Sequence, residues 1–443
     1  MMVYHSKKIS HFKWLFLFKI LSFYNCFLYF LIKLVKIIQI KFYSNMGTQP
    51  LKKKEVKKFN VNDFKTKLGF QQSKETNSNA DKPMEWLIMP DAYSTALKLP
   101  GIPENYVTTV VGHSNVGKST LVNHALVAAQ KKGRIPVIYD TENNFDFTYA
   151  RDMGFEAEPV YGDVEVETID SETGEVTITT ERRIVSYEGN FIYFNNAILA
   201  ERYGKMDYAT GKEVAKGRKV AVIEDIAASI NEFLNLQDEG EADAGFLFVW
   251  DSVGSISSFK SYKSSANNAM WDAAAISVAF NTIVNDRIPR SRKISSKYDN
   301  TLLLINKVWL DSMTNPVGPP SLSLKGGNAM YYASRLIILL GGQLKASTKK
   351  LTAQSKGLTY NYGIQTKIKV LKNQLPNPFT VTYEGEVICT THGMIGVEKS
   401  DMEVYRKKYI GDILKSLQNM NTKEELVISE KDITFSEEEE SDI

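Results

Sequence analysis

The chain has 443 residues, of which 43% are apolar and 24% charged, and its formal net charge at pH 7 is +3. These values are typical of a globular protein with one large core, and they exclude a fibrous or wholly disordered chain. Only two cysteines are present, Cys26 and Cys389. They exclude a disulfide framework and a cysteine-based zinc site, and they agree with a cytoplasmic location.

Residues 1–45 differ in composition from the rest of the chain. They contain seven Lys but no Asp, Glu or Arg, and 36 of them are Phe, Ile, Lys, Leu, Asn, Tyr or Ser. A+T-rich untranslated sequence read as protein has this composition, so we expect a misassigned extension and a true start at Met46. The alternative is a membrane anchor, since residues 15–32 approach the roughly 20 apolar residues of a span. Membrane association is expected only in that case.

The remainder of the chain carries 47 basic and 51 acidic residues. Bulk charge therefore does not predict nucleic-acid binding, and a basic surface for it must be local. Residues 46–85 form a polar arm, and within it residues 55–80 are the only candidate N-terminal element for self-association. Residues 86–395 alternate short apolar runs with helical patterns, which predicts an α/β core with a mainly parallel sheet covered by helices on both faces. The expected strands are residues 106–111, 136–140, 246–251, 301–306 and 335–340.

Several segments depart from this alternation. Residues 164–185 alternate polar and β-branched residues around "SETGE", which predicts a β-hairpin within an insertion over about residues 160–220. Residues 363–374 and 379–385 are expected to form a late antiparallel pair. A small helical region is expected at 396–435, followed by a disordered acidic tail at 436–443.

The stretch "GHSNVGKST", Gly112 to Thr120, follows an apolar strand and precedes a helical pattern. It satisfies GxxxxGK[ST], the loop that binds nucleoside triphosphates. Gly112 and Gly117 allow the tight turn that directs backbone N–H groups at the phosphates, Lys118 reaches the terminal phosphates, and Ser119 offers its hydroxyl to Mg²⁺. The predicted nucleotide-binding set is Gly112, His113, Ser114, Asn115, Val116, Gly117, Lys118, Ser119 and Thr120.

Two carboxylates complete the predicted site. Asp251 ends the apolar strand "FLFVWD", where it can hold the metal through water, but Ser252 and not Glu follows it. The base that activates water must then come from elsewhere. Glu142 lies two residues beyond the strand that ends at Asp140, and the carboxyl ends of parallel strands meet at one sheet edge. Asp140 is the rival, with a structural role at the strand end as its alternative.

Five stretches occur in the order found in RecA-like recombinases, over about residues 105–390. Besides the phosphate-binding loop, "VIYDTENNFDFTYARDMGF" resembles the segment in which an Asp-x-Glu ends the second strand. "FLFVWDSVGSI" and "NTLLLINKVW" are similar to the second nucleotide motif and the sensor strand. "LKGGNAMYYASRLIILL" and "TKIKVLKNQLPNPF" resemble the run after the second DNA-binding loop and a late basic strand. The inserted hairpin and short arm favour a phage-type or otherwise divergent member.

The resemblance implies a RecA-like P-loop NTPase core that uses ATP and Mg²⁺, with Glu142 as the catalytic glutamate and Asn306 and Lys307 at the sensor position. It also implies two DNA-binding loops, near residues 257–271 and 308–327. These are polar and carry Gly, Pro, Ser and Lys, as suits contact with a single-stranded backbone. The DNA-binding candidates are Lys260, Lys263, Lys325, Gly326, Gly327 and Asn328, with Trp309 for stacking or wedging between bases.

Two positions depart from the bacterial pattern. Asn306 is followed by Lys307 where the family has Gln, and a lysine can reach a phosphate only as a point charge. The family also carries a Lys-Asn-Lys run whose lysines reach the nucleotide of the neighbouring subunit. Here the run is Lys372-Asn373-Gln374, so only Lys372 carries over. We therefore expect altered coupling between ATP and DNA.

The implied function is a DNA-dependent ATPase that polymerises on single-stranded DNA and promotes pairing and strand exchange with double-stranded DNA, aided by single-strand-binding and mediator proteins. A ring-forming hexameric DNA helicase and a regulatory or mediator ATPase without strand exchange are the alternatives. Arg335 is not at an obvious arginine-finger position and no large N-terminal domain precedes the core, which favours the recombinase. The acidic tail either competes with DNA for the basic loops or serves solubility alone.

Overall fold

The computed structural model describes residues 33, 80–169, 176–265, 269–311, 321–324, 327–343, 345–420 and 427–439. Apart from residue 33, all of these belong to one compact unit, Ser73–Ile443. The predictions for residues 1–45 and for most of the polar arm lie outside the described residues. Within these ranges, no helix combines the length and the apolar character that crossing a membrane requires.

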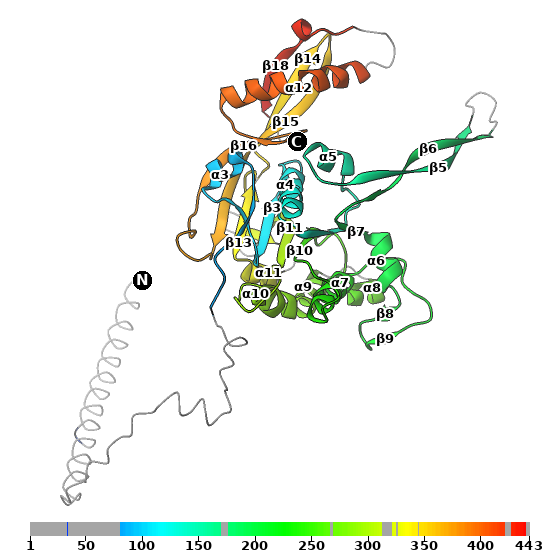
Figure 1. Ribbon diagram of the computed structural model, residues 1–443, viewed down its shortest axis with the longest axis vertical. Coiled ribbons are helices and arrows are strands. Elements are labelled where there is room, and N and C mark those ends of the chain that lie inside the picture. The colour runs from blue at the N-terminus through cyan, green and yellow to red at the C-terminus, as the bar shows by residue number, and fades with distance from the viewer. Residues whose placement is uncertain are drawn as a thin grey trace, which may run out of the picture. The chain divides into compact units, whose positions relative to one another are not determined.

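A twelve-stranded sheet forms the centre of the fold, and its middle is parallel (Figure 1). The parallel strands lie in the order β13-β3-β11-β10-β4-β7. Their bounds are Leu336–Leu340, Val107–Gly112, Thr301–Asp311, Phe246–Val253, Ile135–Asp140 and Ile192–Asn195. The expected α/β fold with a mainly parallel core sheet is thereby confirmed. Five of these strands lie within two residues of the expected runs at their start, because each is a nearly continuous apolar run.

Antiparallel strands extend the sheet beyond β13. They are β15 (Leu358–Asn373), β16 (Glu384–Thr390) and β17 (Gly393–Ile395). In addition, β14 (Lys349–Ser355) pairs with β15, and β18 (Thr434–Glu439) pairs with β14. A short strand, β12 (Ser321–Leu324), pairs with the far end of β11.

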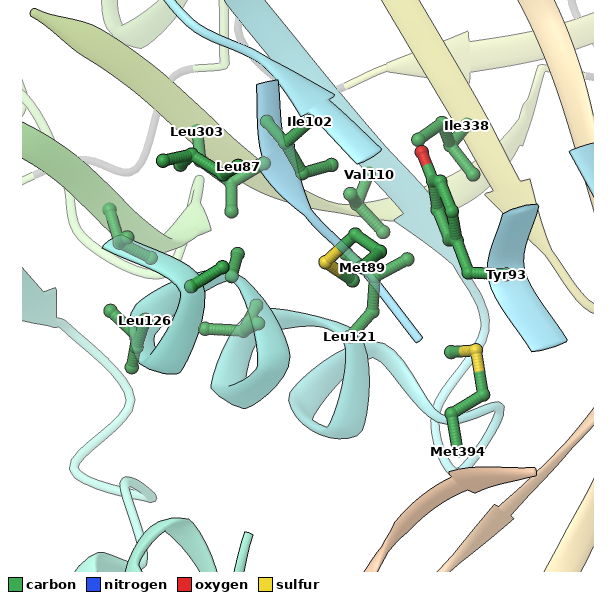
Figure 2. Packing of buried hydrophobic residues seen from close by; sticks show 14 of the residues in the cluster. Leu87, Met89, Tyr93, Ile102, Val110, Leu121, Leu126, Leu303, Ile338 and Met394 are labelled. Atoms are coloured by element: carbon green, nitrogen blue, oxygen red, sulfur yellow. The ribbon is translucent and has the colours of Figure 1, made fainter. Parts of the chain in front are cut away.

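Helices cover both faces of the sheet, and alternate residues of each strand enter two separate cores. Leu303 and Ile305 of β11 pack with α3 (Asp91–Leu97), α4 (Lys118–Lys131) and α5 (Phe147–Asp152). Figure 2 shows this side, with Leu121 and Leu126 on α4 and Val110, Leu303 and Ile338 on the strands of the sheet. Leu302 and Leu304 enter the other core, with α7 (Ile223–Asp238), α9 (Ala269–Ala279) and the π-helical turn η1 (Ile283–Arg287). The anchoring of α4 in the first core holds the phosphate-binding loop at one edge of the sheet.

The remaining elements are short or lie at the periphery. A two-stranded ribbon, β5 and β6, extends from the core (Figure 1). The bounds are β1 Trp86–Ile88, β2 Gly101–Pro103, β5 Glu158–Ile169, β6 Val176–Glu188, α6 Asn196–Tyr203, β8 Met206–Asp207, β9 Lys212–Glu213, α8 Phe259–Ser264, α10 Ile288–Arg290, α11 Gly327–Ala333, α12 Lys399–Asn419 and the 3-10 turn η2 Glu430–Asp432.

The expected antiparallel pairing of residues 363–374 with 379–385 is confirmed for Glu384 and Gly385 and is wrong for residues 379–383. The partner of β15 is β16, which begins at Glu384 opposite Lys369. The amide of Asn373 explains the difference, because its Nδ2 donates to the carbonyl oxygens of Phe379 and Val381, each at 2.7 Å. These bonds hold the intervening segment as a loop.

The expected disorder of the tail is also wrong for residues 436–439. They belong to β18, which pairs with β14 in antiparallel register. That register places Lys349 and Lys350 opposite Glu439 and Glu438. Cross-strand pairs of opposite charge favour strand formation, so a run of like charge becomes ordered once a basic strand lies beside it. Residues 440–443 lie outside the described residues.

A buried ion pair attaches the segment before α7 to the core. The guanidinium of Arg218 donates to both carboxylate oxygens of Asp225 at 2.8 and 2.9 Å, and the two side chains are 6% and 0% exposed. Asp225 also accepts from the backbone N–H of Val222 at 2.9 Å. One carboxylate thus joins the insertion to the first turn of α7.

Arg218→Ala is expected to destabilise the protein by about 3–5 kcal/mol, because it leaves Asp225 charged and buried without its cation. Arg202→Ala is the matched control, since its ion pair with Glu232 has side chains that are 52% and 39% exposed. The control should cost less than about 1 kcal/mol. Urea unfolding of both variants measures the difference, and equal losses would contradict the structural role given to Arg218.

Candidate nucleotide-binding site

The phosphate-binding loop runs between the end of β3 and the start of α4. Gly112 is the last residue of β3 and lies opposite Leu340 on one side and Lys307 on the other. A Cβ on Gly112 would come within 2.6 Å of the carbonyl oxygen of Leu340, so only glycine fits there. Gly117 has φ +91°, in the left-handed region that other residues rarely adopt. Both glycines predicted to shape the loop are required by its backbone.

Lys118 begins α4, and its ammonium group turns back over the loop. Its Nζ donates to the carbonyl oxygens of Gly112, at 3.1 Å, and of His113. Burial lowers the pKa of Lys118, and Lys307 acts in the same direction, whereas Asp251 and Glu142 oppose the shift. A cation in this position is poised for an anionic group, which would relieve the cost of its burial.

Asp251 and Glu142 meet at the same sheet edge because β10 and β4 are parallel and in register, with Asp251 opposite Asp140. Burial raises the pKa of Asp251 to about 6, and the carboxylates of Glu142 and Asp140 add to this effect. Such a group favours a cation beside it, because a cation offsets both the burial and the repulsion.

Glu142 has two donors. Its Oε1 accepts from the hydroxyl of Ser252 and forms an ion pair with Nζ of Lys307 at 2.9 Å. Burial would raise the pKa of Glu142, but these two donors outweigh it and the pKa is lowered. Glu142 is therefore held as a carboxylate by residues from β10 and β11.

Asp140, the rival candidate for the base, is engaged elsewhere. It is 2% exposed, and its oxygens accept from the backbone N–H groups of Asn144 and Phe145 and from the hydroxyl of Tyr193. These bonds, 2.9 to 3.1 Å long, close the turn after β4. Asp140 thus shapes the loop that carries Glu142.

These groups surround one cavity of about 520 Å³. Its lining is Ser114, Asn115, Gly117, Lys118, Ser119, Val122, Asn123, Glu142, Asn144, Phe145, Asp146, Tyr149, Asp251, Ser252 and Lys307. Sequence reasoning did not single out Asn144, Phe145, Asp146, Tyr149 or Ser252. The tyrosine was visible in the quoted stretch around Glu142, but its place at the cavity follows from the fold of α5 against α4.

The other residues predicted in the loop have different surroundings. Val116 is fully buried, and the hydroxyls of Thr120 and Tyr149 are 2.7 Å apart. His113 is not among the residues that line the cavity, and its Nε2 is 3.3 Å from the carbonyl oxygen of Gln343. The structure thus brings Lys118, Ser119, Glu142, Asp251 and Lys307 together, and uses Val116 to pack the loop.

A sequence model of the RecA N-terminal domain matches residues 87–178. That span contains β3, the phosphate-binding loop, α4 and Glu142. Over this segment the chain is similar to RecA proteins.

The curated relatives are RecA proteins with local similarity only. The chain is 44% identical over 63 residues to Protein RecA of Chlorobaculum tepidum, which covers 14% of this chain and 18% of that protein. It is 36% identical over 70 residues to Protein RecA of Aquifex aeolicus, which covers 16% of this chain and 20% of that protein. It is 30% identical over 82 residues to Protein RecA of Mesoplasma florum, and this match covers 17% of this chain and 25% of that protein. The matched region thus spans about a fifth of the length of these relatives.

Two residues predicted for the site, Asn306 and Lys372, are not among those that line the cavity. Asn306 is 1% exposed on β11, where it pairs with Val111 and Val253. Lys372 of β15 lies opposite Ile337, near the start of β13, whereas the loop adjoins the end of β13. Its Nζ donates to the carbonyl oxygen of Tyr331 at 2.6 Å. Lys372 is therefore at the opposite sheet edge from the phosphate-binding loop of its own chain.

The two expected DNA-binding loops contain regular structure. The first, residues 257–271, includes helix α8, so it is not one long loop; Lys263 forms an ion pair with Asp207 at 2.7 Å, and Lys260 Nζ lies 4.5 Å from the ring centre of Trp271. In the second, the end of β11 pairs with β12, with Trp309 opposite Ser323. Gly327 and Asn328 begin α11, while Lys325 and Gly326 lie outside the described residues. Local capping by Ser258 explains α8, because its side chain accepts from the N–H of Ser261.

The raised pKa of Asp251 predicts a pH dependence for Mg²⁺–nucleotide binding. In the folded protein this carboxyl keeps its proton up to about pH 6, whereas in the unfolded chain it loses the proton near pH 4. The stability of the unliganded protein therefore falls as the pH rises from about 4 to about 6. Metal binding requires the ionised form. We expect affinity for Mg²⁺–ATP to fall as pH drops below about 6, by up to about tenfold per pH unit.

Calorimetric titration with Mg²⁺–ATP from pH 5 to pH 8 measures this dependence. Asp251→Asn should bind weakly throughout and lose the part of the pH slope that belongs to the protein. Asp163→Asn, on the exposed ribbon, serves as the control. Identical slopes for the wild type and Asp251→Asn would show that Asp251 does not hold the metal.

Proposed function

We propose that this RecA-like protein is an ATP-dependent recombinase that forms filaments on single-stranded DNA and promotes homologous pairing and strand exchange. The observation that carries the proposal is the Lys307–Glu142 ion pair in the cavity of the phosphate-binding loop. Lys307 lies on β11, which continues into the second expected DNA-binding segment. The effect of DNA binding at that segment can therefore pass along β11 and Lys307 to Glu142, the carboxylate that we assign as catalytic.

In the proposed reaction, the loop N–H groups and Lys118 bind the phosphates of ATP and Glu142 accepts a proton from the attacking water. The donor set fits Mg²⁺, which prefers oxygen ligands and uses few from the protein. Ser119 would ligate it through its hydroxyl and Asp251 through water. When bound, Mg²⁺ supplies neutralisation of the charge that develops on the phosphate oxygens.

The proposed DNA contacts involve the segments after β10 and β11, with Lys260, Lys263, Trp309, Lys325, Gly326, Gly327 and Asn328 as candidates. Adjacent subunits would enclose ATP, and the position of Lys372 at the far sheet edge suits contact with a neighbour's nucleotide. ATP binding then stabilises the filament and hydrolysis releases it. Double-stranded DNA is the second proposed substrate, and single-strand-binding and mediator proteins are proposed partners in a cytoplasmic, phage-type setting.

A hexameric DNA helicase is the second candidate, because the same nucleotide site serves ring-forming motors. Electron microscopy with single-stranded DNA and ATP separates the two: helical filaments support the recombinase and closed hexamers the helicase. A D-loop assay with matched and mismatched DNA then tests exchange. Filaments that give no D-loops with matched DNA would indicate a regulatory or mediator ATPase instead.

A further inference from the structure

A second cavity, of about 820 Å³, lies beyond the edge strand β7 and shares no lining residue with the ATP cavity. It is lined by the start of α6, by residues 219–222 before α7, and by parts of residues 256–265 around α8. Figure 1 shows α6, α7 and α8 on this side of the sheet. Asn143, which follows Glu142 directly, also lines it. Its volume is within the range of small-ligand sites, about 300–1,000 Å³.

Polar groups that the fold leaves without partners line this cavity. The amide of Asn196 donates from Nδ2 to the carbonyl oxygen of Thr141 at 3.0 Å, while its Oδ1 is buried without a hydrogen-bond partner. A buried acceptor without a donor is costly, and such groups in native proteins usually await a ligand or water. Among the described residues, Asn143 and Lys219 have no side-chain hydrogen bond or ion pair.

An aromatic ring adjoins these groups. Tyr262 of α8 is 42% exposed, and neither its ring nor its hydroxyl contacts another ring, a cation or a polar group among the described residues. By contrast, the hydroxyl of Tyr149 is hydrogen-bonded to Thr120 and that of Tyr203 to Glu232. The ring of Tyr262, the unpaired Oδ1 of Asn196 and the ammonium group of Lys219 together suit a nucleobase with its phosphate. A base offers a flat face for stacking and N–H donors for the amide, and the phosphate offers an anion for the ammonium.

The position of the cavity favours a base that belongs to a strand over a separate nucleotide. Ser257, Ser261, Tyr262 and Ser265 all belong to the first expected DNA-binding segment. On the same segment, Lys260 and Lys263 are the lysines assigned to the DNA backbone. We propose that this cavity receives one base of the bound single strand, stacked on Tyr262, with the adjoining phosphate beside Lys219. This inference rests on the proposed function, and adds a base site to its backbone contacts.

Photo-cross-linking tests the proposal. An oligonucleotide that carries 5-iododeoxyuridine is irradiated with the full chain and ATP, and the modified peptide is mapped by mass spectrometry. We expect the cross-link at Tyr262. Tyr262→Ala should bind the unmodified oligonucleotide about tenfold more weakly, within the range for loss of one base–aromatic stack. Lys219→Gln should weaken binding and reduce its salt dependence. Tyr161→Ala, whose ring is 53% exposed on the ribbon, is the matched control and should bind as the wild type does.

The outcomes separate this site from the function on which it rests. Wild-type affinity in Tyr262→Ala and Lys219→Gln, with the cross-link elsewhere, would overturn the base site while leaving the recombinase intact. Absence of strand binding by the wild type would overturn both. If 5-iododeoxyuridine monophosphate cross-links to Tyr262 as well as the oligonucleotide does, the occupant of the cavity is a separate nucleotide and the proposed strand base is overturned. An oligonucleotide with abasic positions should bind the wild type more weakly and Tyr262→Ala with little further loss.

Discussion

Glu142→Gln is expected to lower ATP turnover by about a hundredfold or more while leaving ATP binding nearly unchanged. Glutamine keeps the size of the side chain and can still accept from Ser252, but it cannot take a proton from the attacking water. Loss of a general base typically costs about 10²–10⁴ in rate. Phosphate release measured with and without single-stranded DNA reports turnover, and calorimetric titration reports ATP affinity.

Two comparisons sharpen this result. Glu165→Gln, an exposed carboxylate on the ribbon, should turn over ATP at the wild-type rate. Lys307→Gln removes the cation that, with Ser252, lowers the pKa of Glu142, so the carboxylate becomes more basic. That variant should alter the ratio of DNA-stimulated to basal turnover. If Glu142→Gln keeps more than half of the wild-type turnover, another group is the base.

Lys118→Ala is expected to weaken ATP binding by about a hundredfold or more and to abolish ATP-dependent filament formation. The ammonium group of this lysine lies on the loop's own carbonyl oxygens, and a charge-assisted contact to phosphate is worth about 1.5–3 kcal/mol per bond. Its removal leaves Asp251 and Glu142 in the cavity without that nearby positive charge. ATP affinity by calorimetry and filament length by electron microscopy measure the two effects.

Lys131→Ala is the matched control, because Lys131 lies in the last turn of the same helix. It changes the same residue type in α4 and should bind ATP as the wild type does. Thermal unfolding without nucleotide checks that both variants are folded. Persistence of DNA-stimulated ATP hydrolysis in Lys118→Ala would overturn the assignment of the whole site.

The core strands were predictable from the sequence because they are buried on both faces. A strand such as β11 or β10 must then be apolar at nearly every position, and that pattern needs no knowledge of its neighbours. Lys118 and Ser119 were predictable for a similar reason, since the loop's requirements for glycine, lysine and hydroxyl are local. The family resemblance extended this to Glu142, whose role depends on which strands are adjacent.

Strand edges and loops depended on tertiary contacts. Residues 436–439 are a run of acidic and polar residues, and by itself such a run favours disorder. They form part of β18 because β14 places Lys349 and Lys350 beside them. Residues 379–383 have the composition of a strand, but the side-chain amide of Asn373 donates hydrogen bonds to the carbonyl oxygens of Phe379 and Val381. In both cases the deciding partner is distant in sequence, or is a single side chain that periodicity does not reveal.

The sequence by itself determined the α/β core and the chemistry of the phosphate-binding loop, because backbone geometry and burial impose those residue types locally. Only the tertiary structure decided that Lys307 pairs with Glu142, that Asp140 closes a turn, and that Tyr262 and Asn196 line a second cavity. Those relations join residues from different strands and helices. Which side chains meet in these two cavities depends on strand order and register, and no single segment of the chain determines either.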